Sequence, residues 1–108
     1  MRVVALTILA ALALTACGPD EDDLSFDGQY YRSKVKADKN QREVFVVTAR
    51  PASASLLGAR EAARYEATAY CVNRYGRSDI KWVVGPDSPD EALTILNDTL
   101  TLQGECRQ

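Results

Sequence analysis

The chain has 108 residues and a formal net charge of −2, from 13 Lys and Arg against 15 Asp and Glu, and it contains no histidine. Without histidine a Ser-His or Cys-His nucleophilic mechanism is excluded, and the commonest zinc and copper ligand apart from cysteine is missing, so we predict no catalytic residue, metal or cofactor. The length suits one small domain, and the mildly acidic balance argues against a nucleic-acid partner, which would favour a basic domain.

The first stretch has the parts of an export signal. Arg2 supplies a positive charge, residues 3–13 form an uncharged run, and small residues follow. The run is shorter than the roughly 20 apolar residues that a membrane-spanning helix needs. We therefore interpret it as the core of a cleaved signal and not as a permanent membrane helix.

The stretch Leu14-Thr15-Ala16-Cys17 resembles the lipobox of bacterial lipoproteins, in which a leucine and two small residues precede a cysteine. The resemblance implies a signal peptide over residues 1–16, cleavage before Cys17, and a diacylglyceryl group on the Cys17 thiol. Two or more acyl chains on one cysteine give the stable membrane anchoring that a single chain does not. The expected location is therefore the bacterial cell envelope, with the protein anchored to the membrane by lipid.

The residue after the cysteine bears on which membrane holds the anchor. In the lipoprotein family an aspartate at this position retains a protein in the inner membrane. Here the position is Gly18, so the resemblance points to the outer membrane, facing the periplasm. The alternative to lipidation is ordinary secretion, with cleavage after Ala13 and a free Cys17.

Residues 17–25 are interpreted as the lipidated N-terminus and an acidic tether. Residues 20–23 are four successive acids, which repel one another and stay solvated. The alternative is a divalent-cation site, but such sites usually gather spaced oxygen ligands around a turn. The pattern favours a spacer.

Residues 26–108 are expected to form one small α+β domain. Alternation over residues 26–37 predicts a strand, and a turn at residues 38–41 joins it to a second strand at 44–49. The second strand is rich in β-branched residues and is expected to be buried on both faces, ending before Pro51.

Residues 53–75 are the one long helix candidate. Ser53 or Ser55 can cap its start, and Gly76 can cap its end. At 100° per residue two neighbouring apolar stripes are predicted to face the sheet. Tyr65 and Val72 belong to one of these stripes, whereas Arg60, Glu61, Arg64 and Thr68 are expected to face away.

The remaining chain is predicted to complete the sheet. Residues 79–84 form a third strand, and Ser88-Pro89-Asp90-Glu91 has the form of a capping box that starts a single helical turn. Residues 93–96 suit either the end of that turn or a short strand. A tight turn at residues 97–98 then leads to a last strand at 99–105.

Once Cys17 is assigned to lipid, Cys71 and Cys106 remain as a pair in an oxidising compartment. A disulfide between them is the natural interpretation, and its loop of about 35 residues corresponds to roughly 3–4 kcal/mol of stabilisation. The alternative is a redox-active pair, which usually has Cys-x-x-Cys spacing. That spacing is absent here, so the structural role is favoured.

Several residues are candidates for binding a partner. Arg60 and Arg64 lie four positions apart on the expected outer face of the helix, although Glu61 offers Arg64 a local ion pair. Tyr31 and Tyr65 could line a groove, although aromatics at this spacing are more often core. Glu66 lies between the apolar stripes, where burial would require a partner or raise its pKa.

These observations predict a single helix packed on a small, mostly antiparallel four-stranded sheet, in the order strand-strand-helix-strand-strand, with one disulfide. At the level of fold alone the plan resembles small envelope lipoproteins of unknown function. We expect a non-catalytic accessory of the envelope with a protein-binding or structural role. One alternative is an inhibitor or immunity-type lipoprotein that presents residues 85–89 as a rigid loop to an envelope hydrolase, and another is a small hydrolase.

Overall fold

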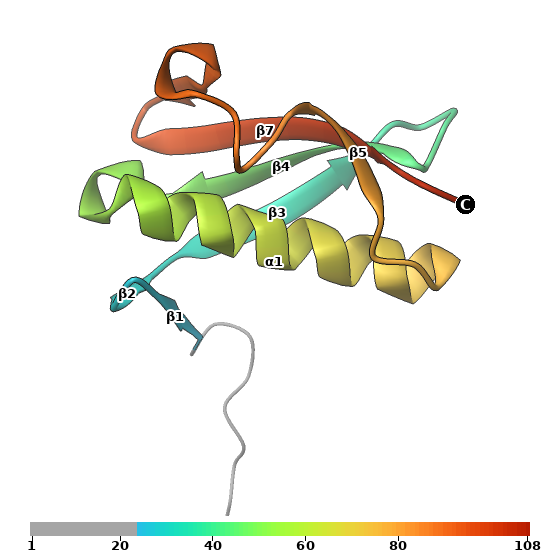
Figure 1. Ribbon diagram of the computed structural model, residues 1–108, viewed down its shortest axis with the longest axis horizontal. Coiled ribbons are helices and arrows are strands. Elements are labelled where there is room, and N and C mark those ends of the chain that lie inside the picture. Colours follow the sequence, from blue (N-terminus) through green and yellow to red (C-terminus); the bar gives the residue numbers. More distant parts are fainter. Residues whose placement is uncertain (1–23) are drawn as a thin grey trace, which may run out of the picture.

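The computed structural model describes residues 24–108 and contains one α-helix and seven strands in that range (Figure 1). The predicted signal peptide, the predicted lipidation at Cys17 and the acids at residues 20–23 lie outside the described residues. The elements, two short 3-10 turns included, are β1 (Ser25–Phe26), β2 (Gln29–Tyr30), β3 (Arg32–Ala37), β4 (Val44–Arg50), η2 (Ala52–Ala54), α1 (Leu56–Tyr75), β5 (Ile80–Val84), η3 (Asp90–Ala92), β6 (Thr94–Leu96) and β7 (Thr99–Cys106). The α+β class with one helix is confirmed.

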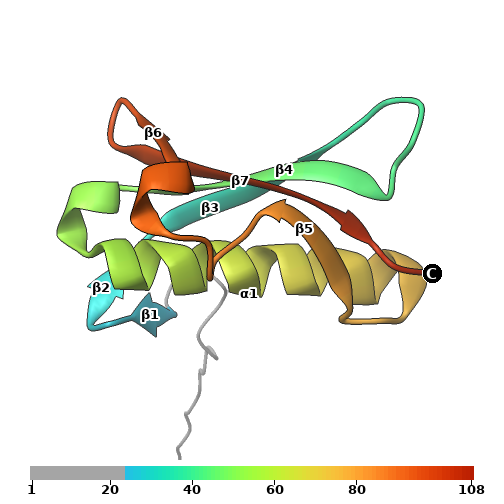
Figure 2. The same cartoon turned by 45° about the horizontal axis from the view of Figure 1, so that its top comes forward.

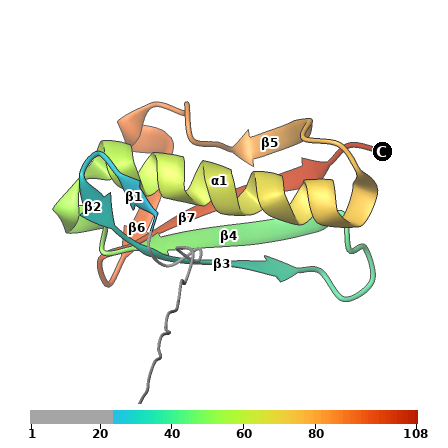
Figure 3. The ribbon, with the colours of Figure 1, turned by 90° about the horizontal axis from the view of Figure 1, so that it is seen from below.

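The main sheet has five antiparallel strands, in the order β3-β4-β7-β5, with β6 also paired to β7 (Figure 3). The register places Val47 between Val35 on β3 and Leu102 on β7. The first part of β7 pairs with β6 and the last part with β5, so β7 contacts three strands. The predicted four-stranded sheet is therefore wrong in its count, because β1 and β2 form a separate two-stranded sheet and β6 adds to β7.

One face of the main sheet is buried and the other is open. On β4, Phe45, Val47 and Ala49 are fully buried, whereas the alternating Val44 and Val46 are only half-buried. The prediction that this strand is buried on both faces is wrong, because α1 covers one face only and is the one α-helix in residues 24–108 (Figure 2). A run of β-branched residues does not by itself distinguish one covered face from two.

The helix begins and ends at the predicted caps. The Ser55 hydroxyl oxygen accepts a hydrogen bond from the Gly58 amide at 3.0 Å, and Gly76 lies in the left-handed region with φ of 74°. The face towards the sheet is built from fully buried small side chains, which let the helix lie close to the strands. They are Ala59, Ala62, Ala63 and Ala67.

The orientation of the helix about its axis differs from the predicted one. Tyr65 and Val72 are each 43% exposed, whereas the side chain of Arg60 is only 13% exposed. The spacing of the apolar residues predicts that one side of the helix is buried. How far the buried surface extends around the helix depends on the segments that pack on either side of it. Here the segment after β5 covers Arg60, and the chain before β3 covers only part of the Tyr65 side.

The predicted single strand at residues 26–37 is interrupted by a tight turn. Asp27 and Gly28 have φ of 52° and 74°, so the chain reverses between β1 and β2 before it enters β3. Phe26 then packs against Tyr31 and Tyr65, with ring centroids 6.5 and 5.9 Å apart. The Asp-Gly pair is a known hairpin signal and could have identified this turn from the sequence.

The segment between β5 and β7 contains a short strand, a tight turn and a 3-10 turn. Residues 94–96 form a strand, and Asn97 and Asp98, with φ of 52° and 60°, make the expected tight turn. The predicted capping box is wrong, because the Ser88 hydroxyl accepts a hydrogen bond from the Gly85 amide at 2.9 Å and does not cap η3.

The disulfide between Cys71 and Cys106 is present and buried. It joins the last turns of α1 to the end of β7, with the two Cα atoms 5.4 Å apart. Nearby, Phe45 lies in the centre of the core between Tyr70 and Trp82, each with its ring centroid 5.8 Å away. The predicted staple between the helix and the final strand is therefore confirmed.

Candidate functional site

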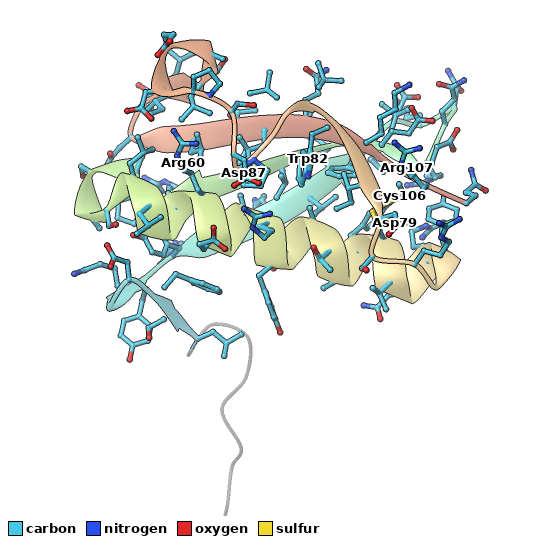
Figure 4. The ribbon with its side chains drawn as sticks, in the orientation of Figure 1. Arg60, Asp79, Trp82, Asp87, Cys106 and Arg107 are labelled. Atoms are coloured by element: carbon cyan, nitrogen blue, oxygen red, sulfur yellow. A yellow bond between two sulfur atoms is a disulfide. The ribbon has the colours of Figure 1, made fainter. Side chains whose placement is uncertain are left out.

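Arg60 holds a loop and does not form part of an exposed patch. Its guanidinium donates hydrogen bonds to the carbonyl oxygens of Pro86 and Ser88, at 2.9 and 2.5 Å, and pairs with the Asp90 carboxylate. Figure 4 shows Arg60 on α1, directed towards the chain that leaves β5. The expectation that Arg60 faces outwards is corrected, because these carbonyl groups accept the guanidinium at the helix flank.

Arg64 forms the local ion pair that was the alternative to a binding patch. Its side chain contacts Glu61 at 3.1 Å and Asp87 at 2.7 Å. The hydrogen bond with Asp87 is the main cause of the raised pKa of Arg64, with burial acting in the opposite direction. Exposed pairs of this kind contribute about 0.2–1 kcal/mol, so Arg64 secures the same loop only weakly.

The two tyrosine candidates lie in different surroundings. Tyr31 is 8% exposed, and its hydroxyl donates a hydrogen bond to the Ser55 carbonyl oxygen at 2.9 Å, so its ring packs in the core, which was the alternative to a binding role. Tyr65 remains exposed beside Phe26. Glu66 is half-buried and has an interaction partner, so it marks no site. The four candidates do not share one surface.

The structure instead presents a surface on the uncovered face of the main sheet. The outward side chains of β3 are all cations and all exposed: Arg32, Lys34 and Lys36. On β4 the exposed Arg50 lies directly opposite Arg32 in the register. Within residues 24–108, none of these four side chains forms an ion pair or hydrogen bond. Hereafter the four residues are called the basic strip.

A cavity of about 730 Å³ adjoins the end of the basic strip where β3 begins and β4 ends. It is lined by Tyr30, Tyr31, Arg32, Ser33, Arg50 and Pro51. The exposed, alternating cations of Arg32-Ser33-Lys34-Val35-Lys36-Ala37 could have indicated an open sheet face from the sequence. The approach of Arg50 could not have been inferred without the register.

The half of the same face that is formed by β5, β6 and β7 carries a mixture of apolar and polar side chains and fewer cations. Val83 on β5 and Leu96 on β6 are each 70% exposed, and β7 contributes Thr99 and Thr101. In the part of the chain that is described, no group of three His, Cys, Asp or Glu residues could hold a metal ion. No helix within residues 24–108 has the length and apolar character to cross a membrane.

No protein-family model, curated protein or solved structure matches the chain.

Proposed function

We propose that this protein is a lipid-anchored accessory of the bacterial envelope, attached through Cys17, that binds an envelope protein without catalysing a reaction. The proposed membrane is the outer membrane, and the domain faces the periplasm. The lipobox-like Leu14-Thr15-Ala16-Cys17 supports the anchor, and the open sheet face supports the binding role.

The binding role is supported mainly by apolar side chains that are exposed on the face of the sheet that no helix covers. Val83 and Leu96 are 70% exposed, and Val44 and Val46, across β7 on β4, contribute half-buried surface to the same face. Exposed apolar side chains with polar neighbours on an uncovered face are compatible with a protein interaction site. The partner is therefore expected to dock on β5, β6 and β7.

The arrangement of the anchor supports the same surface. The described chain starts beside β1, which packs on α1, and Figure 2 shows the β1–β2 sheet and the main sheet on opposite sides of the helix. A chain tethered before β1 is therefore attached on the helix side of the domain, at the end where β3 begins. The open face is then accessible to a partner in the periplasm.

The two alternatives have less support. Gly85 and Pro86 are buried and Arg60 holds their loop, so residues 85–89 do not protrude as an inhibitory loop would. The cavity beside the basic strip is lined by no carboxylate, whereas a hydrolase that uses paired carboxylates needs two acids across a cleft.

The anchor is tested by metabolic labelling with a fatty acid. The wild-type protein is expected to incorporate the label and to sediment with membranes, whereas Cys17→Ser incorporates none. The matched control is Cys71→Ala with Cys106→Ala, which removes the other two cysteines and leaves the label in place. Equal labelling of wild type and Cys17→Ser would show that the anchor proposal is wrong.

The binding surface is tested by photo-cross-linking in intact cells. A photoreactive residue at Leu96 or Val83 is expected to give one discrete cross-linked species with another envelope protein. The matched control is Val72, which is also exposed but lies on the helix. Cross-linking of equal yield and pattern from all three positions would indicate random collisions and contradict a binding role for the sheet face.

A further inference from the structure

Two arginines lie opposite each other at one end of the main sheet. Arg32 is the first residue of β3 and Arg50 the last of β4, and the two are direct cross-strand partners. Like charges directly opposite each other destabilise a sheet. No carboxylate among residues 24–108 pairs with either guanidinium. The fold therefore holds two positive charges together without a described counter-charge.

The surroundings of the two guanidinium groups resemble a binding site for an anion. Both arginines line the cavity of about 730 Å³, together with Tyr30, Tyr31 and Ser33. Lys34 extends the positive surface along the same face of β3, two residues and about 7 Å further on. Planar guanidinium groups bind phosphate oxygens in a bidentate manner, so the pair suits a phosphate ester.

The position of the cavity bears on the source of that phosphate. Tyr30 lines the cavity, is 63% exposed, and pairs with Ser25, close to where the described chain starts. An extended chain covers at most about 3.6 Å per residue, so the segment from Cys17 to Ser25 spans no more than about 29 Å. A lipid on Cys17 would keep Ser25, the strand partner of Tyr30, within this distance of the headgroups. Exposed arginine and tyrosine side chains are suited to that interface.

We propose that the Arg32–Arg50 cavity binds the phosphate of an anionic lipid headgroup in the membrane that holds the anchor. Binding there would fix the edge of the sheet at β3 next to the membrane and direct β5 and β6 away from it. The placement at the membrane rests on the proposed anchoring at Cys17, whereas the affinity of the cavity for phosphate esters does not.

The test uses the chain from residue 17 with Cys17→Ser, which contains every described element, the disulfide included. Sedimentation with phosphatidylcholine vesicles is compared with sedimentation with vesicles that also contain phosphatidylglycerol. The wild-type sequence is expected to bind the anionic vesicles only. Arg32→Gln with Arg50→Gln should weaken this binding about 30-fold, from roughly five- to sixfold per cation near an anionic surface.

The matched control is Lys81→Gln with Arg107→Gln, which removes the same charge at the opposite end of the sheet, where Figure 4 shows Arg107 beside Cys106. This control is expected to lose less than threefold in affinity. Thermal unfolding should show that the Arg32 and Arg50 variant remains folded, because removing two facing like charges relieves a repulsion. Equal losses in the two double variants would overturn the proposal in favour of diffuse attraction.

Two further arms exclude other occupants. Titration with glycerol phosphate, followed by amide NMR, should shift the resonances of Arg32, Ser33 and Arg50, but a shift without any vesicle binding would assign the cavity to a soluble anion. A variant in which the acids at residues 20–23 are neutralised is compared with the wild-type sequence. If this variant binds vesicles and the wild-type sequence does not, the chain's own acidic run occupies the cavity and the proposal is wrong. Because these arms use an unlipidated chain, failure of the fatty-acid labelling would overturn only the anchor.

Discussion

Replacement of Cys71 and Cys106 by alanine is expected to lower the free energy of unfolding by about 3–4 kcal/mol. The bond joins residues 35 positions apart, and a loop of that length restricts the unfolded chain by about this amount. The folded domain has little to compensate, since its largest fully buried side chains are Phe45, Leu100, Leu102 and Val47. Alanine avoids placing a hydroxyl group in this buried site.

Urea denaturation of the double alanine variant measures the loss, and reduction of the wild type should reproduce it. Cys17→Ser is the matched control and should leave the transition unchanged, because it removes a cysteine outside residues 24–108 and keeps the disulfide. A double alanine variant that unfolds at the wild-type urea concentration would mean that packing between α1 and β7 supports the fold without the bond.

Gly58→Ala is expected to destabilise the protein by up to about 3 kcal/mol, although it replaces a helical glycine by the residue with the highest helix propensity. A Cβ at position 58 would meet the Tyr31 hydroxyl and would lie 2.6 Å from the Phe26 carbonyl oxygen. The backbone oxygen cannot move without shifting β1, so the clash outweighs the gain of about 1 kcal/mol that propensity alone predicts. A loss of stability would show that the steric clash dominates, and a gain would show that helix propensity dominates.

The measurement is again urea denaturation, with Thr68→Ala as the control for helix propensity on a less crowded side of α1. That control should gain a few tenths of a kcal/mol. Adding Tyr31→Phe to Gly58→Ala should recover part of the loss, because it removes the nearest clashing oxygen. The close packing of β1 on α1 is incorrect if Gly58→Ala and Thr68→Ala stabilise the protein to the same extent.

The elements that the sequence predicts well depend on local signals. Ser55 and Gly76 mark the ends of α1 because caps act on the adjacent turn, and Pro51 follows the last residue of β4. The pairing of Cys71 with Cys106 follows from the small number of available thiols. These features need no knowledge of the residues that lie nearby in space.

The incorrect or open predictions concern contacts between distant segments. The direction of Arg60 depends on carbonyl groups that follow β5, and the burial of Tyr31 depends on its packing beside α1. The site itself combines both kinds of information. The exposed cations of β3 are visible as an alternating pattern, whereas only the strand register brings Arg50 opposite Arg32.

The pairing of β7 with three strands has a consequence for the order of events during synthesis. Residues 99–106 follow almost all of the described chain, yet they supply the partner for β4, β5 and β6. Until they emerge, the hairpin of β3 and β4 has one unpaired edge that carries Phe45 and Val47, and the sheet cannot close. The nascent chain is therefore expected to stay unfolded until late, and the unpaired edge of β4 is open to aggregation until then.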